Sequence, residues 1–365
     1  MPVPAVNLHP AIERTRERWE THLREMFDRG QFILGPQVAE FERELARAFS
    51  ATEAVGVGNG TDAIGLSLRA AGVAGEVITS ALTAPFTGIG ILSAGCAPRF
   101  ADIDPRTLQI DAGDAGNRVT RRTAAFVPVH LYGAPCELDR FASMARSLKK
   151  ALVQDACQAH GARFKGKPFT QYSPFVAYSF YPTKNLFCLG DGGAVLTSSA
   201  KMAKRLRELR DGGRRGGQVT YSPGINSRLD EMQACYLRAF LPMLEEWNAG
   251  RARTARLYDE ALRDCPGIGL VSRGEESVCH LYVVRARKRE RLRRFLLEKG
   301  IATGVHYPLP LHLHPSYREC GLKRGDLPHA EKACREILSL PLWPYLPAAA
   351  AGEVAERIRQ FYRRP

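Results

Sequence analysis

The chain has 365 residues, of which 45% are hydrophobic and 25% charged, a composition typical of a soluble globular protein with room for two domains. No apolar run is long enough to span a bilayer, and the opening residues MPVPAVNLHP lack the basic and apolar regions of a secretory signal. The net charge of +14 predicts an anionic ligand, which a nucleic acid, a phosphorylated cofactor or a nucleotide-linked substrate would each satisfy.

The basic residues alternate with acidic ones, as in RERWETHLRE and KRLRELRD. This pattern is typical of solvated helix faces and disfavours a nucleic-acid groove. The nine cysteines are scattered, odd in number and free of any CxxC pair, which favours reduced thiols over a disulfide framework. We therefore expect a cytoplasmic protein without a nucleic-acid or membrane partner.

Amphipathic helices are expected first, over residues 10–29 and 38–49. Strands then alternate with helices. The expected strands are residues 54–58, 76–82, 98–103, 123–129, 151–156, 176–181 and 194–197. The expected helices are residues 63–72, 87–94, 138–149 and 200–210. Such alternation predicts an α/β fold with a mainly parallel central sheet flanked by helices on both faces.

The last third of the chain reads as a smaller α+β unit. A strongly periodic helix covers residues 226–247, where Pro242 is expected to introduce a kink. The later expected elements are helices at 250–262, 288–299, 329–337 and 352–362, a strand at 280–285 and a strand-like run at 302–308. We expect an N-terminal helical arm (1–30), a large domain (31–249) and a small C-terminal domain (250–365).

Polar residues gather at the expected strand ends, where open α/β sheets bind their ligands. They are Thr61, His130, Asp155, Ser179 and Lys184. The stretch from Val176 to Leu196 (VAYSFYPTKNLFCLGDGGAVL) places Lys184 in a loop between two strands. A single loop lysine is more often a solvated surface charge, so the convergence of five strand ends carries more weight than this motif alone.

These residues match what pyridoxal phosphate needs. Lys184 can hold the cofactor as an imine, and Asp155 can keep the pyridine nitrogen protonated so that the ring acts as an electron sink. Gly60 and Thr61 open a helix whose N-terminus favours an anion, and Ser179 can join them around the phosphate.

Other cofactor classes lack their motifs. No GxGxxG follows an early strand, and GNGTDAI lacks the GK[ST] ending of a Walker motif. There is no HExxH, and the pair His312 and His314 lacks further ligands, so we expect no metal site.

Nearly the whole chain resembles the DegT/DnrJ/StrS-type sugar aminotransferases, which depend on pyridoxal phosphate and have fold type I. Two strings are most specific: QDACQAHGA (154–162) and YSFYPTKNLFCLGDGGAV (178–195). Further matching strings are FILGPQVAEFERELA (32–46), GNGTDAI (58–64), GCAPRFADID (95–104), PVHLYGAP (128–135), GINSRLDEMQA (224–234), GVHYP (304–308) and DLPHAEKACREILSLP (326–341).

The resemblance implies a role for each matching residue and makes residues 31–249 the cofactor-binding domain. Lys184 is similar to the Schiff-base lysine and catalyst, Asp155 to the partner of the pyridinium, and Gln158 to the residue beside the ring. The implied phosphate contacts are Gly60, Thr61, Ser179 and, from the neighbouring subunit, Asn226. This implies a homodimer with shared active sites. Arg228, His306 and Tyr307 are candidate substrate contacts, for each of which a structural salt bridge or packed loop is an equal alternative.

The chain departs from the family pattern at several positions. Gln154 stands where glutamate is usual and Cys157 where alanine is usual. Ala84 stands where an aromatic usually stacks on the pyridine ring; Phe86 either takes that role or the ring is held differently. The loop 211–223 carries paired arginines that either meet a substrate phosphate or are solvated.

The resemblance implies an aminotransferase that moves an amino group from an amino acid, expected to be glutamate, to a ketosugar expected to be nucleotide-linked. A ketocyclitol substrate is an alternative. A related sugar dehydratase is disfavoured, because the resemblance implies a histidine there in place of Lys184. A non-catalytic protein that uses its basic surface would not need an intact lysine, aspartate and phosphate site.

Overall fold

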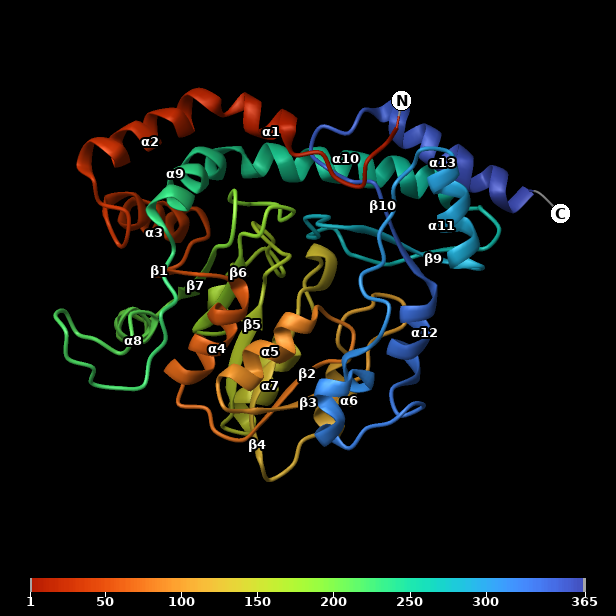
Figure 1. Cartoon of the computed structure of the whole chain (residues 1–365). Coiled ribbons are helices and arrows are strands. Elements are labelled where there is room, and N and C mark those ends of the chain that lie inside the picture. Colours follow the sequence, from red (N-terminus) through yellow and green to blue (C-terminus); the bar gives the residue numbers. More distant parts are fainter. Residues whose placement is uncertain (1, 364–365) are drawn as a thin grey trace.

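The computed structural model describes residues 2–363, and a seven-stranded sheet lies at its centre (Figure 1). The strands are β1 (Glu53–Val57), β2 (Glu76–Ser80), β3 (Ala97–Ala101), β4 (Thr123–Val127), β5 (Ala151–Asp155), β6 (Phe175–Ser179) and β7 (Gly193–Thr197). Their order is β1-β7-β6-β5-β4-β2-β3. Only β7 runs against its neighbours β1 and β6, so the sheet is mainly parallel, as the sequence predicts.

Helices cover both faces of this sheet. One face carries α3 (Pro36–Ala48), α7 (Leu138–Ser147) and α9 (Glu231–Phe240), and the other carries α4 (Gly60–Ala70), α5 (Pro85–Ser93) and α8 (Ala200–Arg210). Successive strand residues point to opposite faces, so Ile78 and Val176 join the first layer while Val77 and Ala177 join the second. Burial on both sides explains why these strands read as continuous apolar runs.

A second, three-stranded antiparallel sheet forms what we call the C-terminal unit. It contains β8 (Ile268–Leu270), β9 (Tyr282–Ala286) and β10 (Ile337–Leu340). The helices α10 (Leu244–Leu262), α11 (Arg289–Glu298) and α13 (Ala348–Arg363) pack against it around one apolar cluster. A further cluster, which includes residues of α12 (Pro328–Glu336), joins this unit to the edge of the central sheet.

Several predicted elements differ in the structure. The expected helix over 10–29 is interrupted at Thr15, between α1 (His9–Arg14) and α2 (Arg16–Arg29), where the Thr15 hydroxyl donates to the Ala11 carbonyl at 3.0 Å. The run at 302–308 is not a strand and forms a single bridge, between Gly304 and Ser339. The sequence did not reveal β8, β10 or the short helix α6 (Ala112–Asn117).

The junction between the two halves of the chain is a continuous helix. Pro242, which lacks an N–H, lies in a 3₁₀ turn (Leu241–Met243), and α10 then runs without a break through residue 250. The expected domain boundary near 250 therefore falls inside a helix. The N-terminal segment also pairs with the C-terminal unit, since Val3 bridges Ile301.

All nine cysteines are free thiols, seven of them buried. Within residues 2–363, no helix is both long and apolar enough to cross a membrane. In the same range, no three His, Cys, Asp or Glu side chains gather as a metal site would require. His312 instead contacts the Glu331 carboxylate, at 3.2 Å.

Candidate active site

The Lys184 loop joins β6 to β7 and is held at both ends by backbone hydrogen bonds. The Phe180 N–H donates to the Gly192 carbonyl at 2.7 Å, and the Cys188 N–H donates to the Phe180 carbonyl at 2.8 Å. Lys184 itself sits in a turn, where its N–H donates to the Tyr181 carbonyl at 2.8 Å. This fixes the backbone from which the lysine side chain extends.

The Lys184 side chain is half-buried, close to Asp155 and Cys157. Burial lowers the pKa of the amine below its ordinary value, and the attraction of Cys157 and Asp155 offsets only part of that effect. Among residues 2–363, the amine has no salt-bridge or hydrogen-bond partner. A lowered pKa raises the fraction of neutral amine, which is the form that attacks a carbonyl carbon.

Asp155 ends β5 and is only 4% exposed. One carboxylate oxygen accepts the hydroxyl of Thr87 at 2.8 Å, and the other accepts the backbone N–H of Cys157 at 3.1 Å. No Lys, Arg or His of the described chain forms a salt bridge with it. A buried carboxylate that is oriented yet unpaired can neutralise a cationic group of a ligand.

The first turn of α4 adjoins Ser179. The N-cap Asn59 accepts the Asp62 N–H at 2.8 Å, but the N–H groups of Gly60 and Thr61 have no partner within residues 2–363. A Cβ on Gly60 would lie 2.6 Å from the Ser179 Cβ and 2.9 Å from the Cys157 Sγ, so only glycine fits. Free N–H groups at a helix N-terminus favour an anion here.

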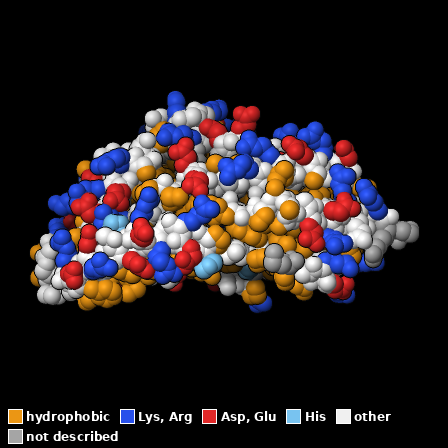
Figure 2. Space-filling view, turned by 90° about the horizontal axis from the view of Figure 1, so that it is seen from above, with side chains coloured by type: hydrophobic (Ala, Val, Ile, Leu, Met, Phe, Trp, Pro, Cys, Tyr) orange, Lys and Arg blue, Asp and Glu red, His pale blue; other side chains and the backbone are white. Residues whose placement is uncertain are grey.

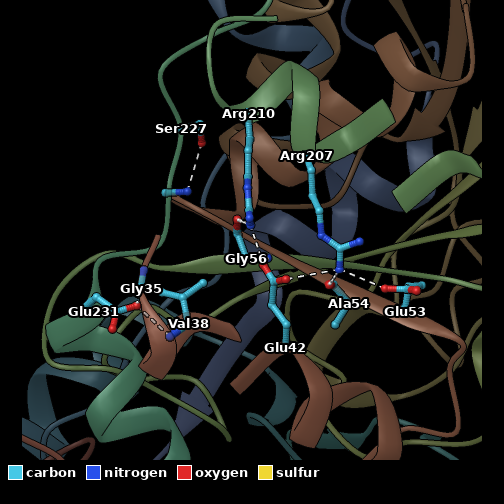
Figure 3. A network of polar contacts seen from close by, with 11 residues as sticks. Gly35, Val38, Glu42, Glu53, Ala54, Gly56, Arg207, Arg210, Ser227 and Glu231 are labelled. Atoms are coloured by element: carbon cyan, nitrogen blue, oxygen red, sulfur yellow. Dashed lines mark hydrogen bonds and ion pairs between the residues drawn. The ribbon is translucent and has the colours of Figure 1, made fainter. Parts of the chain in front are cut away.

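A buried polar network supports this turn from behind (Figure 3). Arg210 on α8 contacts the Glu42 carboxylate on α3 and donates to the Gly56 carbonyl at 2.7 Å. The Gly56 N–H in turn donates to the Glu42 carboxylate at 2.8 Å. Two residues further along, the Gly58 N–H donates to the Ser227 hydroxyl at 3.0 Å, and that hydroxyl donates to Asp62 at 2.6 Å. The network fixes β1 and hence the start of α4.

Gln158 is held between two tyrosines. Its side-chain oxygen accepts the N–H of Tyr132 at 2.7 Å, and its side-chain N–H donates to the Tyr307 hydroxyl at 3.2 Å. Burial raises the pKa of Tyr307 to about 12, so the phenol stays protonated at neutral pH. The two contacts fix the plane of the Gln158 amide.

Three histidines surround the lysine. Burial and then the charge of Lys184 lower the pKa of His160 to about 3, and they lower the pKa of His280 and of His306 too. The His280 Nδ1 contacts the side-chain oxygen of Asn185 at 3.1 Å, which places the proton on Nδ1. These rings are therefore neutral at pH 7.

The family model described as the DegT/DnrJ/EryC1/StrS aminotransferase family matches residues 13–359. The chain belongs to this family. It is 41% identical to a "Pleiotropic regulatory protein" of Geobacillus stearothermophilus, across 100% of this chain and 99% of the relative. It is 39% identical to the dTDP-3-amino-3,4,6-trideoxy-alpha-D-glucose transaminase of Streptomyces venezuelae, across 99% of this chain and 97% of the relative.

Solved structures of family members share the fold. The S. venezuelae DesV structure, in complex with a ketimine intermediate, superposes with a TM-score of 0.96 at 38% identity and covers 100% of this chain and 99% of its own. A DegT/DnrJ/EryC1/StrS aminotransferase from Brucella abortus gives 0.93 at 30% identity, covering 98% and 99%. The predicted fold class, the aminotransferase activity and the dependence on pyridoxal phosphate are thereby confirmed.

The site of this family member fits pyridoxal phosphate. The unpaired Lys184 amine, the unpaired Asp155 carboxylate and the free N–H groups at Gly60 and Thr61 lie close together around Cys157. They would hold the carbonyl carbon, the ring nitrogen and the phosphate respectively, with Ser179 beside the phosphate. When bound, the cofactor supplies an electron sink that stabilises a carbanion at the substrate carbon.

Other predicted site residues lie less directly on this pocket. Asn226 is exposed, beside Ser227, and no hydrogen bond of its side chain is found within the described chain. The guanidinium of Arg228 pairs with Asp211 at 2.9 Å. Phe86 is 62% exposed at the start of α5, so its stacking role stays a prediction.

His130 lies in the loop after β4, as expected, but its ring contacts the core. Its Nδ1 accepts the Cys136 N–H at 3.2 Å, its Nε2 contacts Gln154 at 3.2 Å, and the ring stacks on Phe169 with centroids 4.3 Å apart. The side-chain oxygen of Gln154, where the family usually has glutamate, thus accepts a hydrogen bond from the neutral His130 ring. Strand-end position alone did not separate His130 from the site residues.

The sequence reasoning missed three residues that contact the site. Thr87 holds Asp155, Tyr132 holds Gln158, and His280 lies close to Lys184. Each belongs to a different segment of the chain. Thr87 carried a usable signal, because a hydroxyl in the first turn of a helix that follows a strand end points toward the sheet edge.

Proposed function

We propose that this protein transfers an amino group from an amino-acid donor, expected to be glutamate, to a ketosugar carried on a nucleotide. The observation that carries the proposal is the proximity of the Lys184 amine and the Asp155 carboxylate, neither of which has a salt-bridge partner among residues 2–363. This combination suits a reaction that moves protons at a carbon beside an imine, and it has no evident structural role.

The chain's own residues have defined tasks in this reaction. Lys184, whose pKa is lowered, would take up and return the proton at the substrate carbon as general base and acid. Asp155 would hold the cofactor's ring nitrogen in its protonated form. His306 lies close enough to Lys184 to be influenced by its charge, and Tyr307 contacts Gln158, so both are placed to meet the donor or the sugar.

The substrate class comes from the relatives. Four of them, between 34% and 39% identical, are named as transaminases or aminotransferases of dTDP- or UDP-linked sugars. A net charge of +14 would attract the diphosphate of such a substrate. Arg228 is the weaker substrate candidate, because Asp211 already neutralises it.

The test is turnover by the protein loaded with the amino form of the cofactor. A panel of nucleotide-linked ketosugars and ketocyclitols is offered, and the amine formed is identified by mass spectrometry. Amination of a nucleotide-linked ketosugar, absent with Lys184→Ala, is expected. Amination of ketocyclitols alone would favour the alternative substrate class, and deoxygenation without amination would favour a dehydratase.

We also propose a homodimer with shared active sites. An exposed apolar patch adjoins the lysine loop and comprises Phe27, Phe32, Ile33, Tyr181, Leu189 and Met232. Its parts are contiguous: the Phe27 and Phe32 rings lie 6.3 Å apart, the Glu231 N–H donates to the Phe32 carbonyl at 3.2 Å, and the Leu189 N–H donates to Gln233 at 2.9 Å. A second copy would cover this patch and bring Asn226 to the neighbouring pocket.

Complementation tests this dimer. Lys184→Ala and Asn226→Ala are each expected to be inactive alone, while a mixture refolded together regains activity, because each heterodimer holds one intact site. Sedimentation of the wild type as a monomer, or no regain on mixing, would reject shared sites.

The alternative of a basic binding protein gains no support from the face of the molecule shown in Figure 2. There, Lys and Arg side chains are interspersed with Asp and Glu, and no single-sign stripe forms. The free cysteines support a cytoplasmic location as part of this proposal. The division into 1–30, 31–249 and 250–365 also stays a proposal.

A further inference from the structure

Tyr132, in the loop after β4, has a left-handed backbone (φ 60°, ψ 10°) although it is not a glycine. Such a conformation costs free energy and persists where the surrounding structure enforces it, often at functional sites. The side chain is 5% exposed and belongs to the apolar cluster that joins the C-terminal unit to the central sheet.

Every polar group of Tyr132 is engaged, and each partner is near the cofactor pocket. Its N–H donates to the Gln158 side-chain oxygen at 2.7 Å. Its carbonyl accepts the His280 N–H at 2.9 Å, and its phenol donates to the His306 carbonyl. One residue thus connects Gln158 with two segments that flank β9, the 280 segment and the 306 segment.

The neighbouring Gly133 shows how closely these segments meet. A Cβ there would lie 2.8 Å from the His280 nitrogen and 3.0 Å from the Gln158 carbonyl oxygen, and its φ of 92° also disfavours a side chain. Its carbonyl accepts the Val278 N–H at 3.0 Å. The loop therefore cannot shift relative to either segment without breaking these contacts.

The contact from Tyr132 decides which way the Gln158 amide faces. A backbone N–H can only donate, so the amide oxygen must face Tyr132 and the amide N–H must face Tyr307. Tyr307 directly follows His306, whose carbonyl holds the Tyr132 phenol. Three hydrogen bonds and the peptide link between His306 and Tyr307 therefore join Tyr132, Gln158, Tyr307 and His306 into a closed loop.

We propose that Tyr132 is a positioning residue that sets the orientation of Gln158 and Tyr307 toward the cofactor through its backbone N–H and its phenol. The inference rests on the proposed function, because it takes this pocket as the cofactor site. Burial raises the pKa of the Tyr132 phenol, so it remains a donor to the His306 carbonyl throughout the working pH range.

The test compares Tyr132→Phe with the control Tyr258→Phe. Both variants keep the ring and lose one buried phenol, and the Tyr258 hydroxyl donates to the Pro341 carbonyl at 3.0 Å, inside the C-terminal unit. Both variants should melt at similar temperatures. Only Tyr132→Phe should lower kcat, by about five- to tenfold, and shift the pH midpoint of the bound cofactor's visible absorbance by about half a unit.

A double-mutant cycle tests whether the effect of Tyr132 on the cofactor passes through Tyr307. If Tyr132 acts through the Gln158–Tyr307 contact, Tyr132→Phe should change the absorbance midpoint much less in a Tyr307→Phe background than in the wild type. Equal shifts in both backgrounds would overturn the proposal, as would a Tyr132→Phe protein whose midpoint and kcat match those of Tyr258→Phe. A wild type that shows no cofactor absorbance would instead reject the proposed function.

Discussion

The hydroxyl of Thr87 donates to the Asp155 carboxylate at 2.8 Å, which ties the first turn of α5 to the end of β5. The Thr83 hydroxyl lies 3.0 Å from that of Thr87 and extends the contact. Because the second oxygen of Asp155 accepts the Cys157 N–H, two donors from different elements fix the carboxylate plane. The orientation of the proposed ring-nitrogen partner is therefore set before any ligand binds.

Thr87→Val should weaken cofactor binding, because it removes a hydrogen bond to a buried charge while keeping the side-chain shape. A loss of about 1.5–3 kcal/mol corresponds to roughly ten- to hundredfold in the dissociation constant. Titrating the apoprotein with pyridoxal phosphate and following the visible absorbance measures it. Thr87→Ser keeps the hydroxyl and should bind as the wild type does. Equal affinity of Thr87→Val and wild type would refute the role.

Gly60→Ala should impair both stability and cofactor binding. Its Cβ would lie 2.6 Å from the Ser179 Cβ, an overlap that forces the first turn of α4 away from β6 at a cost of about 1–3 kcal/mol. Gly352, in α13, is the control, because nothing lies within 4 Å of its added Cβ. Gly352→Ala should stabilise the protein by about 0.5–1 kcal/mol. Urea unfolding of both variants measures the two changes in the free energy of unfolding. A Gly60→Ala protein as stable as the wild type would contradict the close approach of Gly60 to Ser179.

Glu42→Gln should destabilise the polar network of Glu42, Arg210 and Gly56 that fixes β1 and the start of α4. Arg210 is 6% exposed and would keep a buried charge without its carboxylate, a loss of about 3–5 kcal/mol. Glu40 offers a surface control, since it pairs with the exposed Arg43. Glu40→Gln should change the free energy of unfolding by at most about 1 kcal/mol. Similar losses in the two variants would show that the Glu42 network contributes no more than a surface pair.

His130 predicts a pH dependence of stability. Burial lowers its pKa to about 4 from an ordinary 6.5, so the unfolded chain binds more protons than the folded one between these values. Stability that is present above pH 6.5 is therefore lost as the pH falls toward 4, at up to about 1.4 kcal/mol per pH unit. The free-energy difference between wild type and His130→Gln should shrink over this window. A difference that does not change with pH would contradict a neutral His130 in the fold.

The strands and the central residues could be predicted from the sequence because their signals are local. Apolar runs ending in polar residues located β5 and β6, and with them Asp155 and Ser179. The resemblance then assigned Lys184. Prediction failed where distant contacts decide, as at residues 302–308, which pair at only one position, with Ser339. It also missed the helix break at Thr15.

The polar contacts around the site could not be derived in the same way. Nothing local shows that the N–H of Tyr132 meets Gln158, because the left-handed turn exists only when the C-terminal unit packs against it. The alternation of residue types also could not show that His130 faces Phe169 and Gln154. Whether a polar residue at a strand end faces the site or the core depends on which distant segments pack against that strand end.

The most direct test of the account is to find which lysine holds the cofactor. The holoprotein is reduced with borohydride, which fixes the cofactor on its lysine, then digested and mapped by mass spectrometry. The account predicts the adduct on the peptide that carries Lys184, and a Lys184→Ala protein with neither adduct nor visible cofactor absorbance. An adduct on another lysine, or an unchanged spectrum in Lys184→Ala, would contradict it.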